Sequence, residues 1–154
     1  MPNQKILLPY NFTSNDRKAL EFVVRTFANQ KDVEVTLFNV YTPVPEIEMR
    51  GSPIMRKMAS SIQHLIKKVY EQEDALKAVK QELSQNGFSG HQVYHIFKPR
   101  QKDVALEIID LCLNGQFNVV VINHKQSKIT RFFTANVFTK VVTALKDTTV
   151  CTVT

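Results

Sequence analysis

The chain has 154 residues, the size of one ordinary domain, and its 44% hydrophobic and 22% charged residues are typical of a soluble globular protein. No apolar run approaches the roughly 20 residues that span a bilayer, and the first residues lack the apolar region of a signal peptide. We therefore expect a cytoplasmic protein without membrane contact. The net charge of +6 permits attraction to anions, but no aromatic-basic motif accompanies it, so nucleic-acid binding is not expected.

The first 41 residues predict a strand, a helix and a second strand. Residues 5–9 are a short apolar run of strand type, and residues 33–41 are rich in β-branched and aromatic residues. Between them, apolar residues recur at helical spacing from Ala19 to Phe27. Ser14 or Asn15 is expected to cap this helix, with Asp16 favourable in its first turn.

Residues 42–53 contain three prolines and one glycine and are predicted to form a loop, which is either a lid or an irregular crossover. A long helix is then predicted over residues 54–85. Its apolar residues alternate steps of three and four, with Gln72 in the one gap: Met58, Ile62, Leu65, Val69, Leu76, Val79 and Leu83. This spacing also suits a coiled coil, but we expect the stripe to lie on a sheet, with Asn86-Gly87 ending the helix.

The second half of the chain continues the alternation of strands and helices. Strands are predicted over residues 91–97, 118–122 and 149–154, and helices over residues 103–114 and 136–146, with Gly115 as a helix stop. This pattern predicts one α/β domain over residues 1–154. We expect a doubly wound, mostly parallel sheet of five strands with helices on both faces. Ligands of such sheets bind beyond the carboxyl ends of the strands, near the switch in strand order.

Three segments carry a resemblance that covers nearly the whole chain. KILLPYNFTSNDRKAL at residues 5–20, VEVTLFNVY at residues 33–41 and FNVVVINHKQSKITRFFTANVFTKVVTALKDTTVCTVT at residues 117–154 resemble the opening, second-strand and closing segments of the universal stress protein family. The resemblance implies a Rossmann-like fold and a role in the stress response. In nucleotide-binding members, a glycine-rich loop follows the fourth strand.

The glycines of that loop are missing here. By the family pattern they fall on Ile122 or Asn123, on Lys125, and on the first residue of the pair Ala135-Asn136. The family's acidic residue after the first strand falls on Asn11. Glycine lets backbone N–H groups approach phosphates without interference from a Cβ, so its absence argues against the usual mode of ATP binding.

Side-chain charge is the alternative way to bind an anion at the carboxyl ends of the strands. Basic residues follow both the third predicted strand and the fourth: Lys98, Arg100, Lys102, His124, Lys125, Lys128 and Arg131. They form either an anion site or only a solvated basic rim. Including the strand ends and the start of the last helix, the candidate ligand-binding residues are Pro9, Tyr10, Asn11, Val40, Asn123, His124, Lys125, Ser127, Lys128, Arg131, Asn136 and Val137.

No catalytic constellation is recognisable in the sequence. It has no Gly-x-Ser-x-Gly elbow, no Walker motif and no carboxylate pair at the expected strand ends, and His91 and His95 are too far apart on one strand to share a metal. Cys112 and Cys151 are expected to be reduced, packed thiols. We predict a non-enzymatic stress-response binding or regulatory protein without a cofactor, the alternative being an ATP binder that uses a basic loop.

Two expectations concern packing and assembly. Phe132 and Phe133, before the last helix, are expected to pack in the core. The last strand, residues 149–154, alternates apolar and polar residues, and in the family this strand commonly pairs across a dimer axis. We therefore expect a homodimer through residues 149–154. The sequence leaves open whether another protein also binds.

Overall fold

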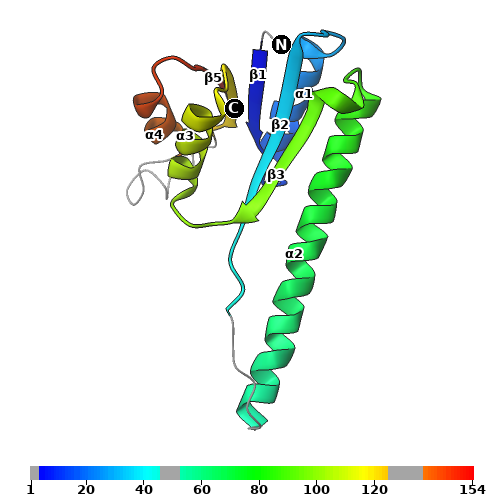
Figure 1. Cartoon of the computed structure of the whole chain (residues 1–154), viewed down its shortest axis with the longest axis vertical. Coiled ribbons are helices and arrows are strands. Elements are labelled where there is room, and N and C mark those ends of the chain that lie inside the picture. Colours follow the sequence, from blue (N-terminus) through cyan, green and yellow to red (C-terminus); the bar gives the residue numbers. More distant parts are fainter. Residues whose placement is uncertain (1–3, 46–52, 125–136) are drawn as a thin grey trace.

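A five-stranded sheet forms the centre of the computed structural model, which describes residues 4–45, 53–124 and 137–154 (Figure 1). The strand order is β3-β2-β1-β4-β5, and every neighbouring pair is parallel. The strands are β1 Gln4–Pro9, β2 Val33–Tyr41, β3 Val93–Pro99, β4 Val119–Asn123 and β5 Thr149–Val153. The predicted doubly wound α/β sheet is confirmed, and its described strands are parallel throughout.

Helices cover both faces of the sheet because each central strand is apolar on both sides. In β1, Ile6 and Leu8 face one core while Leu7 faces the other, and all three are fully buried. The first core contains residues of α1 (Ser14–Phe27) and α2 (Pro53–Gln85), and the second contains residues of α3 (Val104–Gly115) and α4 (Val137–Ala144). No described helix is long and apolar enough to cross a membrane.

Several predicted boundaries move by one to three residues. The α1 cap is Thr13, not Ser14 or Asn15, because its hydroxyl accepts from the backbone N–H of Asp16 while the Asp16 carboxylate accepts from the backbone N–H of Thr13. β3 begins at Val93, because residues 90–92 form a short 3₁₀ turn, η1 (Gly90–Gln92). His91 therefore lies in this turn and not on the strand.

Glycine marks the end of α2 as predicted but serves another purpose in α3. Gly87 has φ of 104°, a left-handed conformation that suits a helix end. In α3 the left-handed residue is Gln116, with φ of 54°, while Gly115 is the last helical residue. A Cβ at position 115 would lie 2.5 Å from the ring of Phe117, so glycine is required there by close packing.

The prediction that the whole apolar stripe of α2 lies on the sheet is wrong for its first half. Leu76, Val79 and Leu83 are buried, but Met58 is 45% exposed and Leu65 is 42% exposed. Figure 1 shows the first half of the helix extending past the end of the sheet, away from α3 and α4. We call residues 53–70 the α2 arm.

Candidate functional site

A cavity of about 310 Å³ opens at the carboxyl ends of β1, β2 and β4. β1 pairs with both β2 and β4, so this is the point where the strand order reverses and where doubly wound sheets bind ligands. The lining residues are Pro9, Tyr10, Asn11, Asp16, Phe38, Asn39, Val40, Tyr41, Thr42, Arg100, Val104, Ile108, Ile122, Asn123 and Val137. The volume is at the lower end of the range of small-molecule sites.

One wall of the cavity is apolar. Phe38 and Ile122 come from the strands and Ile108 from α3, and all three are buried in the second core. Val104 and Val137, at the starts of α3 and α4, pack against the same core. This wall could hold a flat apolar group such as a ring.

The opposite edge is polar, and its groups are bonded to one another through Asp16. This carboxylate is 1% exposed, and its Oδ2 accepts from the backbone N–H of Asn11 at 2.8 Å and from the Thr13 hydroxyl at 2.9 Å. Its Oδ1 accepts from the side-chain amide of Asn123 at the end of β4. Asp16 thus ties the loop after β1 to β4 across the switch point and places a negative charge there.

A second set of bonds holds the end of β2. The buried Asn39 side chain donates from Nδ2 to the Tyr10 carbonyl at 2.7 Å and accepts at Oδ1 from Nε2 of Gln72 at 2.5 Å. Gln72 is the polar residue that interrupts the apolar stripe of α2. Its hydrogen bond to Asn39 explains why a polar residue occupies that position. Both polar strand ends are therefore satisfied within the protein.

Two of the three basic residues that follow the predicted third strand are paired with acids of α3, which reduces the basic rim. Lys98 Nζ lies 2.6 Å from Oε2 of Glu107, and Lys102 Nζ lies 2.5 Å from Oδ2 of Asp110. The hydrogen bond from Lys98, with further ones from the backbone of residues 101 and 102, lowers the pKa of the buried Glu107 carboxyl against the cost of desolvation. The predicted rim is corrected accordingly, because α3 supplies acids that the spacing did not reveal.

The structure brings six of the twelve candidate residues to the cavity: Pro9, Tyr10, Asn11, Val40, Asn123 and Val137. His124 lies beside them, with its backbone N–H bonded to the Val153 carbonyl at 2.8 Å and its ring 4.8 Å from that of Phe138. The other five candidates lie outside the described residues, as do Phe132 and Phe133: Lys125, Ser127, Lys128, Arg131 and Asn136. Whether any of the twelve binds a ligand stays a prediction.

Sequence reasoning missed Asp16 and Asn39 as cavity residues. Asp16 was assigned only to the helix start, although an acid three residues after a threonine signals a capping box close to the strand end. Asn39 lies near the end of β2, and its contact with Gln72 of α2 depends on tertiary packing, which no local pattern shows.

The described residues hold no group of three metal-ligating side chains. Burial raises the pKa of the Cys112 thiol to about 11 and also raises the pKa of Cys151. A protonated thiol is a poor nucleophile, which agrees with the expected structural role of both cysteines.

A parallel sheet with a cavity at its switch point defines a doubly wound α/β domain. The model of the universal stress protein family matches residues 2–151, and the chain belongs to this family. No curated protein matches the chain.

Solved structures with the same fold include three that cover nearly the whole chain. The hypothetical protein MJ0577 is 21% identical with a TM-score of 0.69, covering 99% of this chain and 96% of its own. Universal stress protein UspA from Lactobacillus plantarum is 13% identical with a TM-score of 0.67, covering 100% and 99%. A universal stress protein from Archaeoglobus fulgidus, in complex with dAMP, is 12% identical with a TM-score of 0.64, covering 100% of both chains. At these identities the likeness establishes the fold.

Proposed function

We propose that this protein is a cytoplasmic, non-catalytic regulatory module of the stress response, which does not bind ATP through a phosphate loop of the family type. The observation that carries the proposal is the buried Asp16 carboxylate at the switch point, bonded to Asn123. A phosphate group approaching the end of β4 would meet this negative charge, and the Asn123 amide already has an acceptor. Both effects disfavour an anion at this edge.

A nucleotide binder is the second candidate, and the cavity itself favours it. An apolar wall opposite amide and backbone groups suits a base and a sugar, and the Archaeoglobus fulgidus relative is described in complex with dAMP. In this alternative, Arg100 and the basic residues of the 125–131 segment would supply the charge that glycine-loop N–H groups normally provide.

Calorimetric titration with adenosine, AMP and ATP, after removal of any co-purified nucleotide, separates the two candidates. The proposal expects either no binding or binding of adenosine that phosphates do not strengthen. One ATP per chain, bound at least about tenfold more tightly than adenosine at physiological salt, would instead establish the nucleotide binder.

Two matched variants test whether any observed ligand binds in the cavity. Val40→Trp fills the cavity and should abolish binding there, whereas the matched Val142→Trp changes an exposed residue on α4 and should leave binding intact.

Lys125→Gly restores one glycine of the family pattern and should strengthen ATP binding if the missing glycine is the obstacle. Unchanged ATP affinity in Lys125→Gly would reject that explanation.

We also propose that the chain forms a homodimer through residues 149–154. β5 ends the sheet in the strand order, and an edge strand exposes unpaired backbone groups that a second copy can satisfy. Thr152→Pro would remove a backbone N–H from this strand, and the expected result is a smaller assembly in sedimentation equilibrium with the fold retained in circular dichroism. An assembly of unchanged size in the folded variant would contradict this interface.

A further inference from the structure

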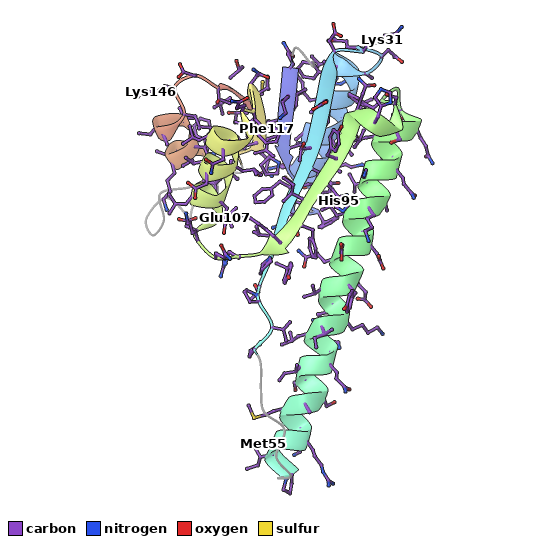
Figure 2. The ribbon with its side chains drawn as sticks, viewed as in Figure 1. Lys31, Met55, His95, Glu107, Phe117 and Lys146 are labelled. Atoms are coloured by element: carbon purple, nitrogen blue, oxygen red, sulfur yellow. The ribbon has the colours of Figure 1, made fainter. Side chains whose placement is uncertain are left out.

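The α2 arm presents an apolar face outside the body of the domain. Met58 and Leu65 are exposed on this face, and Ile54, which is 72% exposed, Ile66, 40% exposed, and Tyr70, 64% exposed, lie beside it. Figure 2 shows Met55 at the far tip of the helix, well separated from His95 of β3. Burying such side chains is favourable, so a face of this kind indicates an interaction surface.

The spacing of this face is that of a helix pairing with another helix. Apolar residues occupy alternating steps of three and four at Met55, Met58, Ile62, Leu65 and Val69. The same register continues into Leu76 and Leu83, which the body of the domain buries. The seam is therefore buried by the domain at Leu76 and Leu83 and exposed at Met58 and Leu65.

We propose that two copies of the chain pair through their α2 arms as an antiparallel helix pair. Centred between Ile62 and Leu65, the pairing sets Ile62 of one copy opposite Leu65 of the other and Met58 opposite Val69. Met55 of one copy then faces Gln72 of the other. Each contact occurs twice, because the interface is the same patch on both copies.

The body of the domain excludes the parallel alternative. From Leu76 onward the seam is occupied by the domain's own sheet, so a parallel partner helix would run into it. In the antiparallel arrangement, each arm ends where the partner's body begins. The two bodies then lie at opposite ends of the helix pair.

Charge complementarity also favours the antiparallel pair. Residues 53–70 carry four basic side chains and no acidic one, and the next turn carries Glu71, Glu73 and Asp74. Antiparallel pairing brings the basic tip, Arg56 and Lys57, level with this acidic turn of the partner. Parallel pairing would set the two basic tips side by side.

A groove beside the arm can receive the partner's tip. Tyr41, Pro43 and Val44 run beside Ile66, Val69 and Tyr70, and together with Glu73, Phe97 and Pro99 they line a cavity of about 450 Å³. The pairing places Met58 of the second copy level with Val69, at this groove. Methionine is flexible enough to fill an irregular apolar space.

Sedimentation equilibrium of matched variants, all carrying Thr152→Pro so that the β5 interface is absent, tests the pairing. Leu65→Glu places a charge on the seam, and His64→Glu places the same charge on the neighbouring exposed position. We expect Leu65→Glu to weaken association at least about tenfold and His64→Glu to change it less than about twofold. Equal behaviour of the two variants, or a Thr152→Pro chain that is monomeric without either of them, would overturn the proposal and leave another protein's helix as the occupant.

Cysteine cross-linking in a Cys151→Ser background tests the direction independently of any effect on folding. Met58→Cys and Val69→Cys chains should form a mixed disulfide with each other. Met58→Cys alone should not cross-link to itself, because the two positions are about 16 Å apart along an antiparallel pair. Efficient self-linking of Met58→Cys, or no mixed product, would contradict the antiparallel arm.

Discussion

Removing the Asp16 carboxylate should destabilise the protein by roughly 2–4 kcal/mol. In Asp16→Ala the backbone N–H groups of Asn11 and Thr13 and the side-chain amide of Asn123 lose their acceptor. A fully buried donor left without a partner costs about 1–3 kcal/mol, and we take the lower part of that range for each because these bonds are only part-buried. The total is a large share of the roughly 5–15 kcal/mol that stabilises a typical domain.

Urea unfolding followed by circular dichroism measures this loss, with an unchanged m-value as the check that only stability has altered. Asp110→Ala is the control, since it removes a carboxylate of the same length from an exposed ion pair and should shift the midpoint little. Asp16→Asn should fall between the two, because one of its side-chain atoms donates where the carboxylate accepts. A loss below about 1 kcal/mol in Asp16→Ala would refute the view that this carboxylate organises the switch point.

Three further outcomes are expected. Gly115→Ala should lower the free energy of unfolding by about 1–3 kcal/mol through overpacking, whereas Gly90→Ala, which has open space for its Cβ, should be close to neutral in the same urea assay. Lys98 depresses the Glu107 pKa in the folded state, so this group's stabilisation is present above the unfolded pKa and is lost as pH falls through the folded one. Glu107→Gln should therefore flatten the loss of stability below the unfolded pKa of 4.5, and an unchanged acid limb would contradict this. With its pKa near 11, Cys112 should react with a thiol reagent only at the rate of unfolding, and fast labelling of the native protein would show an accessible thiol.

The sequence alone determined the elements and their order, because these depend on local periodicity. Residues 33–41 were predicted to the residue as a strand, since β-branched and aromatic side chains suit a pleated, buried surface. The alternation of strands and helices was enough for a parallel, doubly wound sheet, because such crossovers have one favoured hand. The absence of glycine after β4 could also be read from the sequence without a structure.

Only the tertiary structure decided which polar groups satisfy one another. The carboxylate of Asp16 reaches Asn123 across 107 positions of sequence, and Glu107 neutralises Lys98 from a different element. Neither pairing has a periodic signature, because it depends on how α1 and α3 pack on the sheet. The basic rim expected from composition was reduced by such contacts.

The two halves of α2 show most clearly what the spacing of apolar residues does not determine. One apolar stripe with one spacing is buried at Leu76 and exposed at Leu65, and the pattern does not distinguish them. Periodicity reports that a helix has an apolar face, while the length of the sheet beneath it decides how much of that face is covered. Burial is a property of the neighbouring elements, and so the uncovered arm became visible only in three dimensions.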